Sequence, residues 1–247
     1  MKVWVVTGAD SGLGEQITSH IRREALPDST VIPHLGIREG DLTCDLTFTR
    51  YINRIKMYLG DPSEEKLTQV ILINCAAHNH LYRFEDLRLE DYKYMQEINV
   101  EVPWLLVQAL LPWLKPLPPN RLPGIVCNIV SNAAYTPMSF SLAYNVSKAG
   151  LDMVTRQLAH ELTPQYGITI FGLAPHRMRG TQMPLRIDEQ VFELRGWTAE
   201  EAKAYQMKTL LNGEEADPKA VAQAIVWLCS HRDICKTLTG SVLRWGK

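Results

Sequence analysis

The stretch Thr7-Gly8-Ala9-Asp10-Ser11-Gly12-Leu13-Gly14 directly follows a short apolar run, Val3 to Val6, and precedes an amphipathic segment. Glycines between a strand and a helix allow the backbone to turn sharply and to approach a pyrophosphate closely. The free amides and the positive dipole end of the helix then stabilise the negative charge. The spacing is GxxxGxG, and no Gly-Lys-Ser or Gly-Lys-Thr follows, which excludes a Walker phosphate loop. Taken alone, the stretch is equally compatible with a tight strand-to-helix turn that binds nothing.

Outward from this turn, short β-branched runs alternate with longer amphipathic segments, which is typical of repeated βα units and a parallel sheet. We expect strands at Val3–Thr7, Thr30–Leu35, Val70–Asn74, Ile125–Ser131, Ile168–Ala174 and Ser241–Arg244. We expect helices near Gly12–Ala25, Phe48–Leu59, Leu89–Leu114, Leu142–Thr163, Thr198–Leu211 and Pro218–Ser230. Asp41–Asp45 is a candidate for one more short strand, although no crossover helix of about ten residues fits between it and Leu35. These segments predict a single α/β domain over residues 1–247, a doubly wound parallel sheet with helices on both faces.

Composition and charge exclude several classes of protein. The 247 residues contain 26 Lys and Arg against 27 Asp and Glu, so no basic field indicates nucleic acid or an anionic membrane surface. Hydrophobic residues make up 46% and charged residues 21%, which predicts a folded chain. The most apolar stretch, Val102 to Leu114, is interrupted by two prolines and a glutamine and is shorter than the ~18 residues of a membrane span. We therefore expect neither a nucleic-acid partner nor a membrane.

The start of the chain and its cysteines favour a cytoplasmic protein. Residues 1–8 contain one Lys and an apolar run too short for a signal-peptide core. Five cysteines, an odd and widely spread number, indicate free thiols in a reducing compartment. Cys229 and Cys235 flank His231, but the spacing fits no standard zinc pattern, so we expect no metal.

A tyrosine with a lysine four residues later occurs in Tyr144-Asn145-Val146-Ser147-Lys148. Of the nine tyrosines, only Tyr144 has this neighbour. On a helix the spacing places the ammonium beside the phenol. A nearby cation favours the ionised phenol and lowers its pKa from about 10, which makes the tyrosine useful as an acid–base catalyst. Alone, the pair is also what a solvated helix face shows by chance.

Two further polar residues and one segment are candidates for the same site. Ser131 ends an expected strand thirteen residues before Tyr144, where a hydroxyl points toward the ligand crevice of an open α/β sheet. Asn99 lies within an expected helix, although an amide is a mediocre helix former; a capping or solvent-facing position is the alternative. Residues 176–213 lack sheet periodicity and follow the carboxyl end of a strand, which predicts a substrate lid.

Together these residues resemble the short-chain dehydrogenase/reductase family, and the resemblance covers nearly the whole chain. It implies a Rossmann fold and NAD(P)-dependent hydride transfer between a carbonyl and an alcohol, with an Asn, Ser, Tyr, Lys tetrad. Tyr144 would protonate the nascent alkoxide, and Ser131 would stabilise the oxyanion. Lys148 would lower the pKa of Tyr144 and bind the nicotinamide ribose, and Asn99 would hold a water that relays protons.

The resemblance also implies the contacts of the cofactor. They are Thr7, Gly8, Asp10, Ser11, Gly12, Leu13, Gly14, Arg38, Asp45, Leu46, Asn74, Ala76, Tyr144, Lys148, Pro175 and Thr181. Near the end of the second expected strand, an acidic residue would bind a ribose 2'-hydroxyl and a basic one would accept a 2'-phosphate. Gly36 stands at the position of the acid and Arg38 two residues later, so NADP(H) is favoured over NAD(H).

Two positions depart from the pattern of the family. Ala77 stands where a glycine is usual in the segment Asn74-Cys75-Ala76-Ala77, and His176 replaces the glycine that usually follows Pro175. His176 either contacts the cofactor or substrate or is an exposed loop residue. These departures leave open a second hypothesis, a nicotinamide-binding sensor or scaffold without turnover. The resemblance further implies a homodimer or homotetramer formed through the helices at 89–114 and 142–163, and leaves the carbonyl or alcohol substrate undefined.

Overall fold

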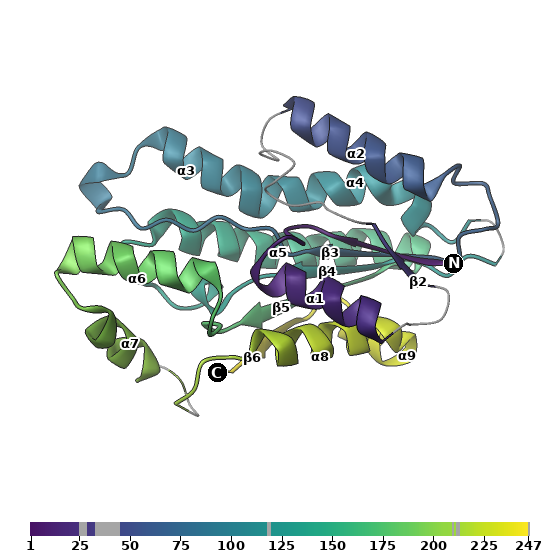
Figure 1. Cartoon of the computed structure of the whole chain (residues 1–247). Coiled ribbons are helices and arrows are strands. Elements are labelled where there is room, and N and C mark those ends of the chain that lie inside the picture. The colour runs from purple at the N-terminus through teal and green to yellow at the C-terminus, as the bar shows by residue number, and fades with distance from the viewer. Residues whose placement is uncertain (25–28, 33–44, 118–119, 209, 211–212, 247) are drawn as a thin grey trace.

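The computed structural model of the chain describes residues 1–24, 29–32, 45–117, 120–208, 210 and 213–246, the side chains of 45–47 and 206 excepted. Six parallel strands form its centre (Figure 1). They are β1 (Lys2–Val6), β2 (Ser29–Val31), β3 (Gln69–Asn74), β4 (Ile125–Ile129), β5 (Thr169–Pro175) and β6 (Val242–Trp245). The spatial order is β2-β1-β3-β4-β5-β6, so the chain reverses direction across the sheet between β1 and β3. In sheets of this kind the ligand crevice lies outside the carboxyl ends of the strands at that point.

Helices cover both faces of the sheet (Figure 1). One face packs against α2 (Asp45–Leu59), α4 (Val102–Leu114) and α5 (Leu142–Tyr166), and the other against α1 (Gly12–Arg23), α8 (Pro218–Ser230) and α9 (Arg232–Cys235). The alternation of side chains along β1 explains both layers, because Val3 and Val5 enter the first core and Trp4 and Val6 the second. The predicted doubly wound α/β domain is confirmed. Among the described residues, no helix is both long and apolar enough to cross a membrane.

The remaining elements are short or lie at the rim of the sheet. They are α3 (Leu89–Gln96), α6 (Gln182–Arg195), α7 (Ala199–Met207), the turns η2 (Phe84–Asp86), η4 (Asn132–Ala134) and η5 (Lys236–Leu238), and the π-helical turn η3 (Glu97–Glu101). The sequence did not predict α6, because only Val191 among its side chains is buried and no clear apolar stripe results. The helix expected at Thr198–Leu211 corresponds to α7.

Most expected elements differ from the structure by only a few residues at their ends, but two differ in type or continuity. Of the candidate strand Asp41–Asp45, residues 41–44 lie outside the described part of the chain, and Asp45 begins α2 and is therefore helical. The single helix expected over Leu89–Leu114 is divided by η3. A π-helical turn accommodates one extra residue, and such turns often occur at functional sites. The turn contains Asn99, whose side chain is fully buried.

Candidate active site

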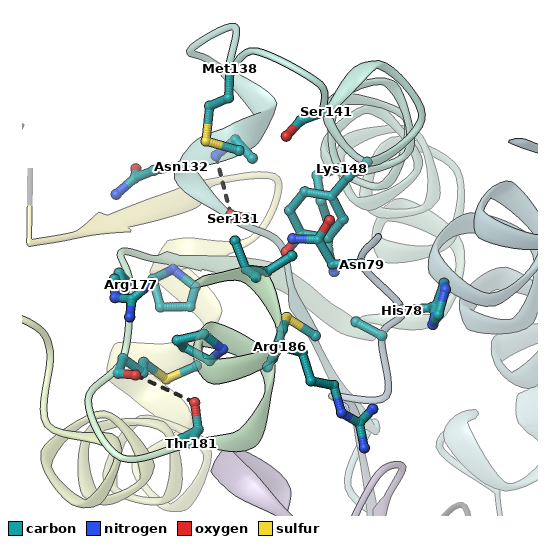
Figure 2. A pocket seen from close by; sticks show the side chains of 18 of the residues that line it. His78, Asn79, Ser131, Asn132, Met138, Ser141, Lys148, Arg177, Thr181 and Arg186 are labelled. Atoms are coloured by element: carbon teal, nitrogen blue, oxygen red, sulfur yellow. Dashed lines mark hydrogen bonds between the residues drawn. The ribbon is translucent and has the colours of Figure 1, made fainter. Parts of the chain in front are cut away.

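A cavity of about 840 Å³ opens at the carboxyl ends of the central strands (Figure 2). Its wall combines the glycine-rich turn after β1, the loop after β3, the end of β4, the start of α5 and the segment 176–213. These parts are far apart in the sequence and meet because parallel strands direct their carboxyl ends to one edge of the sheet.

The glycine-rich turn contributes Gly8, Ser11, Gly12 and Gly14 to the wall. A β-carbon on Gly14 would lie 2.1 Å from the carbonyl oxygen of Gly8, so only glycine permits this turn to close. Gly12 has a φ of +53°, and a β-carbon there would project toward Thr181, 3.8 Å away. The Ser11 side chain makes no capping hydrogen bond to α1, so it does not occupy the amides of the first turn. An open cradle at a helix N-terminus fits the diphosphate of a dinucleotide.

Thr7 and Asn74 support the cavity from behind. The Thr7 hydroxyl accepts hydrogen bonds from the backbone nitrogens of Cys75 and Ala76, each at 2.9 Å. Asn74 is buried, and its Nδ2 donates to Oδ1 of Asn128 at 2.8 Å. Neither Thr7 nor Asn74 lines the cavity. Thr7 thus holds the loop after β3 against the glycine-rich turn, and Asn74 ties the end of β3 to β4.

Ser131, Tyr144 and Lys148 lie together in the cavity wall, as the sequence predicted; Figure 2 labels Ser131 and Lys148. The Ser131 Oγ accepts a hydrogen bond from the Ala133 nitrogen at 3.1 Å, which orients the hydroxyl at the start of η4. Tyr144 and Lys148 lie one turn apart on α5, with Nζ of Lys148 5.8 Å from the centroid of the Tyr144 ring. Nζ also donates to the carbonyl oxygen of Ile129 at 2.9 Å.

Burial controls the ionisation of this group. It raises the pKa of Tyr144, and a hydrogen bond with Ser131 opposes the rise only in part. It lowers the pKa of Lys148 to about 8, with Cys75 exerting a smaller opposite effect, and it raises the pKa of Cys75 itself to about 12. The spacing predicts that Lys148 lowers the pKa of Tyr144; in the structure, desolvation of the phenol raises that pKa, and the influence that opposes it is the hydrogen bond with Ser131. Tyr144 is therefore protonated at neutral pH, the state a proton donor requires.

Asn99 lies directly behind the wall and does not line the cavity. Its Oδ1 accepts from the backbone nitrogen of His78, and its Nδ2 donates to the backbone oxygen of His78, each at 2.8 Å. Nδ2 also donates to Oγ of Ser147 at 2.9 Å. The geometry thus gives the side chain a positioning role toward the loop after β3, and the implied water-holding role stays a prediction.

The other predicted cofactor contacts either line the cavity, as Ala76 does, or do not line it, as for Asp10, or cannot be placed because they lie outside the described part of the chain. The cavity is lined by Pro175 and Thr181 and, within the glycine-rich turn, by Gly8, Ser11, Gly12, Leu13 and Gly14, but not by Ala9 or Asp10. Arg38 lies outside the described residues, and so do the side chains of Asp45 and Leu46. The preference for NADP(H), which depends on Arg38, stays a prediction.

Several further residues line the cavity. His176, one of the two departures, faces the cavity, and its Nδ1 accepts a hydrogen bond from the Arg177 nitrogen at 2.6 Å. The additional lining residues include Cys75, His78, Asn79, Tyr94, Asn132, Met138, Ser141, Arg177, Arg186, Arg195, Trp197 and Tyr205. Asn79 and Asn132 follow β3 and β4 closely, a signal that sequence reasoning had available. The arginines on α6 had no such signal, because that helix was not predicted.

Known proteins are similar to this chain in sequence and in fold. A peroxisomal 2,4-dienoyl-CoA reductase of Arabidopsis thaliana is 29% identical over 201 residues, which cover 73% of this chain and 65% of the plant enzyme, just under two thirds of its length. Glucose 1-dehydrogenase 2 of Bacillus subtilis is 24% identical over 98% of this chain and 92% of its own. A short chain dehydrogenase family protein from Francisella tularensis superposes with a TM-score of 0.78 at 21% identity, covering 99% of this chain and 96% of the other.

A second solved structure, a variant actinorhodin polyketide ketoreductase with NADPH, has the same TM-score of 0.78 at 20% identity, covering 99% of this chain and 96% of that one. At such identities the structural likeness establishes the fold alone. The sequence pattern of the short chain dehydrogenase family matches residues 52–191, which is more than half of the chain. On that match, this protein belongs to the short-chain dehydrogenase/reductase family.

Proposed function

We propose that this protein transfers hydride between a nicotinamide cofactor and a small-molecule carbonyl or alcohol. The observation that carries the proposal is the placement of Ser131, Tyr144 and Lys148 in one cavity whose wall also contains the glycine-rich turn. The turn fits a dinucleotide diphosphate, and the three side chains supply a stabiliser, a proton donor and a cation. A relative named as a glucose dehydrogenase and a ketoreductase neighbour solved with NADPH support the same chemistry. The relative named as a dienoyl-CoA reductase supports a reduction, although of a carbon–carbon double bond.

In the reductive direction, the nicotinamide supplies the hydride to the carbonyl carbon. The Ser131 hydroxyl would donate a hydrogen bond to the carbonyl oxygen and stabilise the negative charge that develops there. Tyr144, kept protonated by its burial, would give its proton to that oxygen. The Lys148 ammonium would hydrogen-bond to the ribose of the cofactor and stabilise the phenolate left behind.

Three finer statements belong to the proposal. NADP(H) is the preferred cofactor, because Arg38 stands where a 2'-phosphate would be accepted and Gly36 replaces the acid that would exclude it. The segment 176–213 covers the substrate, because both α6 and α7 contribute residues to the cavity wall. The protein forms a homodimer or homotetramer through α4 and α5, and the exposed apolar side chains of Leu142, Val146 and Met153 on α5 support this. Light scattering would then give a multiple of the 28.0 kDa chain mass.

The decisive experiment separates cofactor binding from turnover. Purified protein is titrated with NADPH and NADH, and oxidation of the preferred form is then followed with a panel of ketones, aldehydes and enoyl thioesters. We expect Tyr144→Phe to retain cofactor binding and to lose turnover, and Tyr166→Phe, at the far end of the same helix, to match wild type. Cofactor binding without turnover of any panel member would support a sensor or scaffold instead and overturn the proposal.

A further inference from the structure

The cavity wall carries positive charge and no opposing negative charge. Its basic side chains are Lys148, Arg177, Arg186 and Arg195, and among the described residues no Asp or Glu lines it. Lys148 has a place in the proposed reaction. Arg177 is compensated by ion pairs outside the cavity, with Asp188 and Glu215. Arg186 is an exposed side chain of α6 (Figure 2), whereas Arg195 is half-buried at the end of that helix.

Arg195 is held by aromatic rings on several sides. Its guanidinium carbon lies 4.4 Å from the centroid of the Trp197 ring, 5.2 Å from that of Phe140 and 5.6 Å from that of Tyr205. Trp197 and Tyr205 also contact each other, at a centroid distance of 5.2 Å. Cation–π contacts of this kind fix a guanidinium in place without neutralising it.

No carboxylate completes this arrangement. Within the described part of the chain, the guanidinium of Arg195 has neither an ion pair nor a side-chain hydrogen bond. The planar donor fork of arginine matches a carboxylate in bidentate geometry. A guanidinium that is oriented, charged and lacking an acidic partner in the wall of a cavity is therefore a preformed site for an anion.

The position of Arg195 assigns that anion to the substrate side of the cavity. Thr181, directly before α6, faces Gly12 of the glycine-rich turn. Arg195 ends α6, and the 14 residues of the helix extend over about 21 Å. The residue is thus remote from the cradle for the cofactor diphosphate. Its aromatic partner Phe140 belongs instead to the loop that connects Ser131 with Tyr144.

The backbone at Phe140 supports a ligand-binding role for the part of the cavity wall around Arg195. Phe140 has a φ of +65°, and no other non-glycine residue among those described has a positive φ. Its carbonyl oxygen accepts a hydrogen bond from the Tyr82 nitrogen at 2.9 Å, which helps to hold the loop in this conformation. Unfavourable backbone conformations of bulky residues concentrate at ligand sites, where the surrounding structure maintains them.

The cavity wall close to Arg195 and Phe140 is apolar. Leu81, Ile187, Val191 and Ala202 both pack together there and line the cavity. Building on the function proposed above, we propose that the substrate is a carbonyl compound, or the corresponding alcohol, with an apolar body and a carboxylate at the end remote from the reacting carbon. Arg195 binds this carboxylate and determines specificity.

Matched pairs of substrates test the proposal. A series of keto carboxylates of increasing chain length is compared with their methyl esters, which have the same body without the charge. We expect wild type with NADPH to prefer the acid of the best length by about tenfold or more in kcat/KM. Arg195→Met should remove this preference through a higher KM for the acid and leave the ester unchanged, and Arg195→Lys should retain part of it.

Arg83 provides the matched control. Its guanidinium carbon lies 5.8 Å from the same Phe140 ring and it donates to the Leu194 carbonyl oxygen, yet it does not line the cavity. Arg83→Met should keep the preference for the acid. An equal kcat/KM of wild type for acid and ester, or an equal loss of kcat/KM for both in Arg195→Met, would overturn the carboxylate site. Arg195 would then be a structural support for the segment 176–213.

A binding measurement separates this inference from the proposed function. Calorimetry of the protein with NADPH present compares the affinities for the acid and the ester without requiring turnover. If no ketone is reduced but the acid binds more tightly than the ester, and Arg195→Met abolishes the difference, the anion site stands and the reductase proposal falls. If esters are turned over and acids are neither preferred nor bound more tightly, the reductase proposal stands and the anion site falls.

Discussion

Asn99 and His78 are joined by two hydrogen bonds of opposite direction, each 2.8 Å long, between the side-chain amide of Asn99 and the backbone N–H and C=O of His78. The amide nitrogen makes a third bond, to Ser147 on α5. Asn99 therefore fastens the loop after β3 to α5, and this loop carries Ala76 and Ala77, which line the cavity. The π-helical turn that contains Asn99 makes this placement possible.

Removing this amide is expected to weaken both the fold and cofactor binding. Asn99→Leu has a similar volume but removes three hydrogen bonds, two with the His78 backbone and one with the Ser147 hydroxyl, so the free energy of unfolding should fall by about 3 kcal/mol. The affinity for NADPH should fall as well, because the loop loses its attachment. Asn99→Asp keeps the acceptor for the His78 nitrogen but sets a carboxylate opposite the His78 carbonyl oxygen at a fully buried position, so it should cost at least as much. Urea unfolding and cofactor titration measure both effects; a leucine variant with unchanged midpoint and affinity would contradict the positioning role.

The pH dependence of cofactor use should report Lys148. Burial lowers the pKa of Lys148 to about 8, so the ammonium is present below that pH and lost above it. If the ammonium binds the cofactor, kcat/KM for the cofactor should be level below pH 8 and decline above it. The buried Tyr144 phenol, whose pKa is raised from its usual 10, adds no decline in this range. Lys148→Arg retains its charge at high pH and should show no decline near pH 8, even at a lower overall rate.

The same lysine should reduce the stability of the fold. Its pKa is 10.5 in an exposed setting and about 8 here, so the charged form disfavours folding by about 3 kcal/mol at neutral pH. This penalty is fully present below the folded pKa and disappears as the pH rises through the ordinary value. Lys148→Met removes it but also loses the bond to Ile129, so the variant should gain less than this amount.

Urea unfolding of Lys148→Met and wild type near pH 7 and near pH 10 checks this expectation. The variant should be more stable at neutral pH and lose its advantage toward the higher value, while its turnover is abolished. A variant less stable than wild type at neutral pH would show that the hydrogen bond to Ile129 outweighs the desolvation of the ammonium.

The parts of the fold and site that the sequence predicted are those set by short-range pattern. The central strands β1, β3, β4 and β5 are buried and produce continuous apolar runs, so the sequence reveals them, and the doubly wound class follows from their alternation with helices. The glycine-rich turn lies within one βα unit, and Tyr144 and Lys148 lie within one helical turn. The proximity of Tyr144 and Lys148 therefore follows from the helix alone and does not depend on how distant segments pack.

The parts that could not be predicted depend on contacts between distant segments. The direction of the pKa change of Tyr144 follows from its burial, which no local spacing encodes. The role of Asn99 depends on His78, 21 residues earlier in a loop. The aromatic surroundings of Arg195 require α6, because this helix carries the arginine. The helix packs on α7 and buries few side chains, so its sequence lacks the apolar stripe from which a helix is inferred.

Alanine substitutions at two glycines test whether the close packing inside the glycine-rich turn is needed for NADPH binding. Gly14→Ala places its β-carbon against the Gly8 carbonyl oxygen, a backbone atom that cannot yield without opening the turn. We expect loss of NADPH binding and marked destabilisation. Gly150→Ala on α5 meets only the Val100 side chain, with Cγ2 at 3.3 Å, a group that can rotate, and should remain within about 1 kcal/mol of wild type. If both variants bind NADPH equally, the turn does not hold the diphosphate.

Arg177 should hold the segment 176–213 together, because it lies at the start of the segment and pairs with Asp188 inside it and with Glu215 just beyond its end. It donates from both terminal nitrogens to Asp188 on α6, at 3.0 and 2.6 Å, and from Nε to Glu215 beyond α7. All three side chains are only 13–14% exposed. Arg177→Met would leave two carboxylates facing each other without a cation, so we expect the free energy of unfolding to fall by about 3 kcal/mol.

The neighbouring Arg179 supplies the control, because its bond to Asp217 joins the same regions at the surface, with side chains 58% and 35% exposed. A surface pair of this kind contributes under about 1 kcal/mol, so Arg179→Met should be close to wild type. Urea unfolding measures both variants, and limited proteolysis with mapping of the first cleavage site shows whether the loss is local. We expect the first cut in Arg177→Met to fall within 176–213. Equal stabilities of the two variants would show that the double ion pair merely replaces hydration and holds nothing in place.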